Sequence, residues 1–158
     1  MLINTDEKTI ITHFLIVLSL VLFICPFRLY ATIYTVSVAT DSNPNGGGSG
    51  SGNTGDLRYV LNLLNGGTGS GGTAGTVGPD VSNNTINFTT SGLSTLNLAA
   101  NLPVILNGVV INGPTPAQSI SGGGLFRMFA TFKASLTLNN LALADGLALG
   151  GSGASTSS

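Results

Sequence analysis

The sequence predicts an all-β protein: a right-handed parallel β-helix, incomplete and with few coils, that follows an N-terminal strand and a short capping helix. Short runs of alternating apolar and polar residues between Asn84 and Gly146 are the first observation, because alternation puts apolar side chains on one face of a strand. The resulting apolar pairs are Ile86 with Phe88, Leu96 with Leu98, Val109 with Ile111, Leu136 with Leu138, and Leu141 with Leu143. Gly, Asn, Pro or Asp closes each run, and the breaks are too short for crossover helices. The chain is therefore expected to bend after each strand and to stack on its own previous turn.

Residues 1–31 are predicted to be a signal peptide. The apolar run FLIVLSLVLFIC begins at Phe14. Its length suits the apolar region of a leader better than a bilayer span of about 20 residues. Cleavage is expected after Ala31. Acidic residues offset the lysine near the amino terminus, so an uncleaved N-terminal anchor is the alternative.

Residues 32–83 are predicted to form an N-terminal cap. Thr32 to Thr40 is rich in β-branched residues and is expected to be a strand. A helix is expected over 56–65, because Asp56 can serve as its N-cap and apolar residues follow at helical spacing. Laid across the open end of a β-helix, this helix would cover the exposed core.

Residues 84–149 are predicted to be the coils, or rungs, of the β-helix. Leu106–Gly113 (LNGVVING) echoes Leu138–Asp145 (LNNLALAD), which predicts a weak internal repeat. No C-terminal cap follows, and residues 150–158 form a Gly/Ser-rich end. The chain is therefore expected to be a fragment that stops within a repeat.

The composition places the chain outside several functional classes. Its 158 residues suffice for one domain, with 23 glycines, 7% charged residues and a net charge of −1. Low charge with abundant Gly, Ser, Thr and Asn is typical of extracellular β-structure. A net charge of −1 supplies no basic surface for nucleic acid, so nucleic-acid binding is excluded.

The chemistry available after cleavage is limited. The single His, Cys and Glu, which are His13, Cys25 and Glu7, would all be removed with the leader, which excludes Ser–His and Cys–His catalysis in the mature chain. The remaining acids are Asp41, Asp56, Asp80 and Asp145, and the remaining bases are Arg58, Arg127 and Lys133. No two acids within the coils are close in sequence. We therefore predict no catalytic residue, no cofactor and no metal.

Several polar residues have a structural interpretation. Asp41 to Gly46 matches the first half of a calcium loop, but its twelfth position is Gly52, so an Asx/Gly turn is favoured. Asp145 precedes a glycine and is interpreted as a turn residue. Arg127 and Lys133 are expected at exposed edges. The turn asparagines fit left-handed positions or stacked side-chain ladders, and they are Asn107, Asn112, Asn139 and Asn140.

An ordered set of short motifs runs through residues 34 to 150. They are the strand Tyr34–Ala39, Gly55-Asp56-Leu57-Arg58 with Asn65, Ile86-Asn87-Phe88, Leu102-Pro103-Val104-Ile105, Val109 to Pro114, Ile120-Ser121-Gly122-Gly123, and Thr137 to Gly146. This set resembles the N-terminal modules of secreted bacterial β-helix proteins. These are passengers of the autotransporter or polymorphic-outer-membrane-protein type, with a pectin-lyase-like fold.

The resemblance implies a surface adhesin that is exported to the cell surface or outer membrane. It implies a structural capping motif made of Gly55, Asp56, Leu57, Arg58 and Asn65, in which Arg58 bonds loop carbonyls near the first coil. The implied partners are the export machinery, through the leader, and a host-surface protein or glycan, through the face of a complete β-helix. The outer-membrane barrel of such proteins is missing from this chain.

The sequence thus favours a non-enzymatic fragment of an exported, extracellular or cell-surface adhesin. Two alternatives stay open: the N-terminal piece of a secreted polysaccharide-degrading β-helix enzyme, and an inactive truncated remnant. Clustered Asp and Arg residues on successive coils would favour the enzyme.

Overall fold

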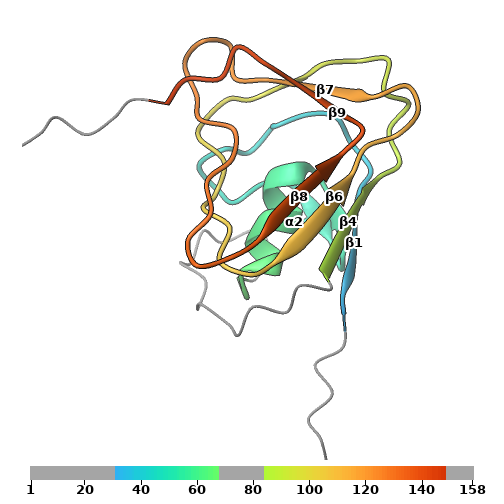
Figure 1. The fold of residues 1–158 in the computed structure, drawn as a ribbon, viewed down its shortest axis with the longest axis vertical. Helices are drawn as coiled ribbons and strands as arrows, with labels where there is room; N and C mark the ends of the chain where they lie inside the picture. Colours follow the sequence, from blue (N-terminus) through green and yellow to red (C-terminus); the bar gives the residue numbers. More distant parts are fainter. Residues whose placement is uncertain (1–30, 68–83, 149–158) are drawn as a thin grey trace, which may run out of the picture. The chain divides into compact units, whose positions relative to one another are not determined.

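The computed structural model describes residues 31–67 and 84–148, which are mostly strand with one short helix (Figure 1). This confirms the all-β-leaning class. The elements are β1 (Ile33–Val36), β2 (Gly50–Ser51), β3 (Thr54–Gly55), α2 (Leu57–Leu64), β4 (Asn84–Phe88), β5 (Leu96–Asn97), β6 (Val109–Asn112), β7 (Gln118–Ser121), β8 (Leu136–Asn139) and β9 (Leu141–Ala144). The predicted leader, apart from Ala31, and the predicted end at 150–158 lie outside the described residues. Within the described part of the chain, no helix is long and apolar enough to cross a membrane.

The strands form two sheets. One has the order β2-β3-β1-β4-β6-β8 and the other the order β5-β7-β9. All neighbours are parallel except β2 and β3, which form an antiparallel hairpin that the sequence did not predict. Along the chain, β4, β6 and β8 of the first sheet alternate with β5, β7 and β9 of the second. Each sheet therefore grows by one strand every time the chain returns to it (Figure 1).

Successive strands stack in register. Ile86 pairs with Ile111 and Ile111 with Leu138, while in the second sheet Leu96 pairs with Ile120 and Ile120 with Leu143. Most inward side chains are apolar, such as Ile86 and Phe88 in β4, although Asn84 of the same strand is also buried. The apolar pairs of the sequence thus lie on one face of each strand.

The internal repeat predicted from the sequence is wrong. It would place Val109 at the level of Leu141, whereas the structure pairs Val109 with Leu136. Leu141 instead pairs with Gln118 in the other sheet. The reason is the turn at Asn140, whose φ of 52° lets the chain leave one sheet for the other immediately after Asn139. The strands that the repeat would match, β6 and β9, therefore lie in different sheets, while Leu138 and Asn139 of the second segment pair with β6 itself.

The first strand is also shorter than predicted. β1 ends at Val36, and Val38 is 41% exposed although Val36 is fully buried. Pairing with β3 ends at Gly55, whose carbonyl accepts the last hydrogen bond on that side from Ser37 N–H at 3.0 Å. Residues 37–43 then continue without strand or helix, and no strand of the described ranges pairs with them.

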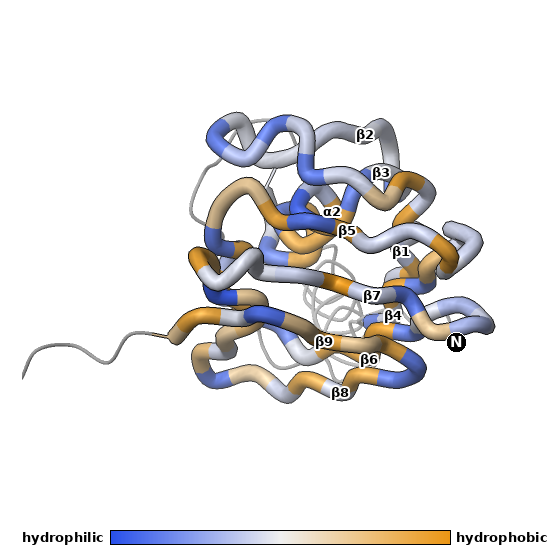
Figure 2. Tube along the Cα trace, turned by 90° about the horizontal axis from the view of Figure 1, so that it is seen from above, coloured by the Kyte–Doolittle hydropathy of each residue, from blue (hydrophilic) through white to orange (hydrophobic). Residues whose placement is uncertain are grey.

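The core lies between the two sheets and extends to the helix. α2 buries Leu57, Val60, Leu61 and Leu64 in one cluster with the inward residues of β1, β4, β5, β6 and β7. Figure 2 shows α2, β2 and β3 toward one end of the stack and β8 and β9 toward the other. Burial falls toward the β8/β9 end, where Leu143 is 45% exposed while Ile120, its neighbour in β7, is fully buried.

Candidate functional site

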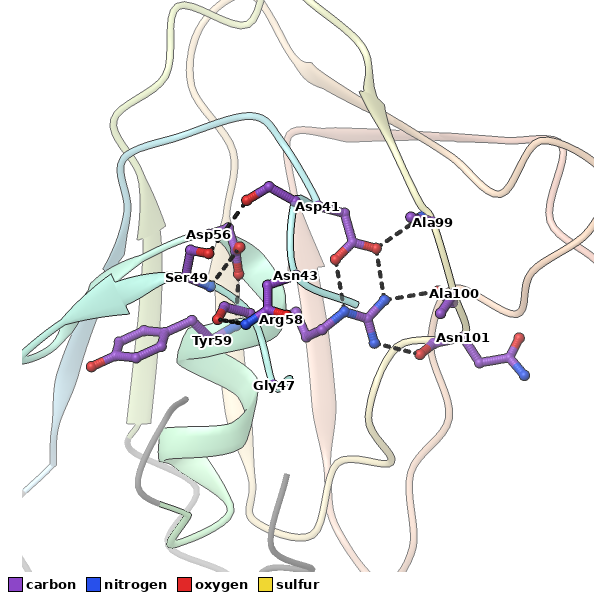
Figure 3. A network of polar contacts seen from close by, with 12 residues as sticks. Asp41, Asn43, Gly47, Ser49, Asp56, Arg58, Tyr59, Ala99, Ala100 and Asn101 are labelled. Carbon is purple, nitrogen blue, oxygen red and sulfur yellow. Dashed lines mark hydrogen bonds and ion pairs between the residues drawn. The ribbon is translucent and has the colours of Figure 1, made fainter. Parts of the chain in front are cut away.

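Asp56 links the start of α2 to the loop residue that precedes β2, Ser49. It is the N-cap, and its Oδ1 accepts the Tyr59 N–H at 2.8 Å, while Oδ2 accepts the Ser49 N–H at 2.8 Å. The sequence pattern works here because an N-cap is a local feature, decided by residues three apart. Both carboxylate oxygens are used, so Asp56 fixes the loop as well as the helix (Figure 3).

Gly55 is required where the hairpin meets the helix. A Cβ at this position would lie 2.6 Å from the Ser49 carbonyl oxygen and 2.6 Å from Tyr59 Cδ1. Leu57, the next member of the motif after Asp56, is 1% exposed and packs in the core. The Gly55-Asp56-Leu57 segment therefore combines a close backbone approach, a helix cap and a core anchor.

Arg58 and Asp41 form a buried ion pair. The Arg58 Nε and Nη2 atoms each lie 2.7 Å from one Asp41 carboxylate oxygen, and the side chains are 4% and 2% exposed. Two parallel N–H···O bonds are the strongest geometry for this pair of side chains. It is the one salt bridge found among the described residues.

The same guanidinium binds the backbone that follows β5. Nη1 donates to the Asn101 carbonyl at 2.7 Å and Nη2 to the Ala100 carbonyl at 2.9 Å, while Asp41 Oδ2 accepts the Ala99 N–H at 2.8 Å. Figure 3 shows these bonds converging from the loop, the helix and the segment 99–101. Arg58 thus satisfies loop carbonyls, as the resemblance implies, and its carboxylate partner completes the network.

The two carboxyl groups respond to burial in opposite ways. Burial opposes ionisation of Asp41, but the Arg58 hydrogen bonds and charge, with the Ala99 and Ala100 N–H groups, hold its pKa below the ordinary 3.8. At Asp56 burial prevails over the Tyr59 and Ser49 N–H bonds, and the pKa is raised above 3.8. The ionised Asp41 beside it contributes to that rise. The two carboxyl groups are near enough to interact electrostatically, yet only Asp41 has a cation on its oxygens.

Two asparagines anchor the other end of α2. Asn65 is the C-cap, and its side chain donates to the Val104 carbonyl at 2.8 Å and accepts the Leu106 N–H at 2.9 Å. Asn107 donates to the Leu64 carbonyl at 2.8 Å, satisfying one of the helix's last carbonyls. The helix is thus tied at both ends to residues 99–107.

A second polar array lies on the outer side of the first sheet. Asn112 Nδ2 donates to Asn87 Oδ1 at 2.9 Å, and Asn139 Nδ2 donates to Asn112 Oδ1 at 2.8 Å. The steps are 25 and 27 residues, one for each return of the chain to this sheet. Of the four asparagines noted in the sequence, Asn112 and Asn139 are in this ladder and Asn140 is in the left-handed conformation. Asn107 instead binds the helix.

The remaining candidates are placed as follows. The Asp41–Gly46 segment is a turn in which Asn43 O accepts the Gly48 N–H at 2.9 Å, and the described residues hold no cluster of His, Cys, Asp or Glu suited to a metal. Asp145 has a φ of 50°, as a turn residue does, and accepts the Ser121 hydroxyl at 3.4 Å. Lys133 Nζ lies 5.4 Å from the centre of the Phe132 ring.

Arg127 was expected at an exposed edge, but it is half-buried. Its Nη2 donates to the Leu102 carbonyl at 3.0 Å, and its Nε is buried without a hydrogen-bond partner. It borders a cavity of about 310 Å³ at the β8/β9 end, otherwise lined by Met128, Phe129, Leu138, Leu143, Gly146, Leu147 and Ala148. We call this space the end cavity.

No protein-family model matches the sequence, and no curated protein and no solved structure is significantly similar to it.

Proposed function

We propose that the described residues are the capped start of a right-handed parallel β-helix. The support is the pairing pattern: successive returns of the chain add parallel strands to two sheets, in register, with mostly apolar residues inward. A third contact of the same kind, an isolated parallel bridge between Ile105 and Thr131, lies between β5 and β6 in one turn and between β7 and β8 in the next. Three stacked sides per turn are what a coil with a triangular section requires.

We further propose that the protein is a non-enzymatic fragment of an exported surface adhesin, of the autotransporter-passenger type. The observation that carries the proposal is the outer face of the first sheet, where uncharged side chains repeat at each level in the rows Thr85–Val110–Thr137 and Asn87–Asn112–Asn139. Such a flat, regular surface, extended by further coils, offers a long contact area rather than a pocket. The partner we propose for it is a host-surface protein or glycan.

The charges of the described residues support a scaffold over an enzyme. Polysaccharide cleavage needs paired carboxylates, or a base beside a cation, facing a substrate. The acids here are committed elsewhere: Asp41 to Arg58, Asp56 to the helix start, and Asp145 to a turn. A polysaccharide-degrading enzyme, or an inactive remnant, stays the alternative.

Sequencing the locus beyond the Ser158 codon, with the intact mass of the product recovered from the cell surface, tests the proposal. Further repeats of the outward Asn row, followed by barrel strands of about ten residues, are the expected result. Clusters of Asp and Arg on successive coils would contradict the adhesin proposal and favour the polysaccharide-degrading enzyme. An intracellular product with an intact leader would overturn the export that both proposals share.

A further inference from the structure

Four asparagines of the chain are followed directly by a glycine, and they are Asn45, Asn65, Asn107 and Asn112. In such a pair the glycine backbone nitrogen can attack Cγ of the asparagine side chain, because no Cβ crowds the nitrogen and the glycine φ is little restricted. The new N–C bond closes a five-membered succinimide, and the side-chain nitrogen leaves as ammonia. Water then opens the ring at one of its two carbonyls and leaves aspartate or isoaspartate. This deamidation consumes only water, so the surroundings of each pair determine which one reacts.

The fold protects Asn65. Deamidation requires a side chain that can turn toward the glycine and a glycine N–H that no good acceptor holds. Asn65 is 5% exposed, and its side chain is held by the Val104 carbonyl and the Leu106 N–H at 2.8 and 2.9 Å. The Gly66 N–H donates to the Leu63 carbonyl at 2.9 Å. Both requirements therefore fail at this pair.

Two further pairs are held by other contacts. Asn107 is 8% exposed, and its Nδ2 donates to the Leu64 carbonyl at 2.8 Å. Asn112 is half-buried, and both polar atoms of its side chain are bonded in the asparagine ladder. The Gly113 N–H that follows it donates to the Asn139 carbonyl at 2.8 Å. Either asparagine can react only after the structure around it opens, which happens in a small fraction of the molecules.

Asn45 has none of these restraints. It is exposed in the turn at residues 44–47, and its side chain has no hydrogen bond within the described part of the chain. The Gly46 N–H reaches the Asn43 carbonyl only at 3.3 Å, beyond the usual range of about 2.7–3.2 Å. The turn is closed instead by two bonds on either side of Asn45, from Gly48 N–H to the Asn43 carbonyl at 2.9 Å and from Asn43 Nδ2 to the Gly48 carbonyl at 3.2 Å. The side chain is therefore free to approach the glycine nitrogen.

We propose that Asn45 is a site of spontaneous deamidation and that the fold protects the other three Asn-Gly pairs. The product carries a carboxylate at an exposed position and, as isoaspartate, one extra methylene in the main chain. The bonds that fix this loop, between Asn43 and Gly48 and from Asn62 Nδ2 to the Gly47 carbonyl at 2.8 Å, do not involve Asn45. The modified chain is therefore expected to stay folded while it gains a negative charge on its surface.

Incubation of the full chain at mildly alkaline pH, in water enriched in the heavy isotope of oxygen, tests the assignment. Opening of the succinimide places an oxygen of that water on the modified residue, which distinguishes the reaction from deamidation during later handling. Digestion and fragmentation mass spectrometry then measure the label at each of the four asparagines. Because a protected amide reacts only in its locally open fraction, Asn45 should acquire the label about tenfold faster, or more, than each of the others.

The same incubation in urea provides the comparison. Unfolding removes the protection, so the four asparagines are expected to acquire the label at similar rates. Far-ultraviolet circular dichroism before and after the incubation without urea shows whether the chain in that sample is folded and stays folded.

Two variants connect the chemistry to the whole protein. Anion-exchange chromatography separates the more acidic product, and this form should be largely lost in Asn45→Ser. Asn97→Ser is the matched control, since Asn97 is exposed, has no side-chain hydrogen bond within the described residues and is followed by Leu98 instead of glycine. It should accumulate the acidic form at the wild-type rate.

Equal labelling of Asn45 and any of the other three asparagines in the folded chain would overturn the proposal, because the fold would then give no selective protection. An acidic form that persists in Asn45→Ser would overturn it too. Label on Asn45 in urea but not in the folded chain would show that the turn itself prevents the reaction. Label concentrated on Asn45 in the folded chain, and spread over all four asparagines in urea, supports the proposal.

Discussion

Replacing Arg58 by methionine should be the most damaging single substitution at the capped end. Methionine retains much of the apolar stem but removes every donor of the guanidinium. The Asp41 carboxylate, 2% exposed, would keep the Ala99 N–H but lose both bonds to the cation. The carbonyls of Ala100 and Asn101 would lose their donors as well.

The expected loss of unfolding free energy is about 4 kcal/mol, because breaking a buried ion pair on one side costs roughly 3–5 kcal/mol. Part of this loss comes from the buried Asp41 carboxylate that is left without a cation, so replacing Asp41 as well should restore part of the stability. We expect the double variant Asp41→Leu with Arg58→Met to be about 2 kcal/mol more stable than Arg58→Met alone. Since a typical domain is stable by about 5–15 kcal/mol, both differences are measurable.

Urea unfolding of the full chain at pH 7, followed by far-ultraviolet circular dichroism, measures these energies. Arg127→Met is the matched control, since Arg127 has one side-chain hydrogen bond, to the Leu102 carbonyl, and no ion pair. It should cost about 1 kcal/mol. An Arg58→Met variant no less stable than Arg127→Met would refute the reasoning, and so would a double variant less stable than Arg58→Met.

Three further results are expected. Folding lowers the pKa of Asp41 below the ordinary 3.8, so the ionised carboxylate stabilises the protein above that pH, and this stabilisation is lost as the pH falls through the pKa of the folded state. The urea midpoint should therefore fall less between pH 7 and about pH 2 in Asp41→Asn than in the wild type. Asn112→Ala breaks two ladder bonds and should cost about 1 to 2 kcal/mol by the same urea assay, whereas Asn97→Ala, at an exposed position without a side-chain hydrogen bond, should be neutral. Gly55→Ala forces a Cβ against the Ser49 carbonyl and should lower the melting temperature, with a loss of about 1–3 kcal/mol; an unchanged melting curve would contradict the close approach.

The helix and its caps could be predicted because they are decided by neighbouring residues. Asp56 accepts a bond from a residue three positions away, and Asn65 lies at the end of a run with helical spacing. The bonds of Arg58 to loop carbonyls followed only from the resemblance. Its ion pair with Asp41 spans 17 residues across a loop, and the Asp41 segment looked like a turn or a calcium loop. Nothing local shows that an acid of a turn will be buried against a helix arginine.

The register between strands could not be predicted from the sequence, for a different reason. Alternation shows which residues face inward but not which strand lies beside which, because the corners add or remove residues at each turn. The two steps of the asparagine ladder are 25 and 27 residues long, so the second turn of the chain contains two more residues than the first. An even difference leaves the same residues of each strand facing the core. Similarity of sequence instead matches Leu106–Gly113 with Leu138–Asp145, which equates β6 with β9 although these strands lie in different sheets. The Asn87–Asn112–Asn139 row was the better signal, because only residues in register can bond side by side.

The two ends of the stack differ in how their polar and apolar groups are satisfied. At one end a buried ion pair, a helix cap and two asparagine anchors occupy polar groups of the helix and of residues 99–107. At the other end backbone edges and leucines lie open, and pairing gains hydrogen bonds and apolar burial without breaking any contact. A strand that paired with β8 would bury most apolar surface if it carried apolar residues two apart on its inward face, because Leu136 and Leu138 of β8 have that spacing.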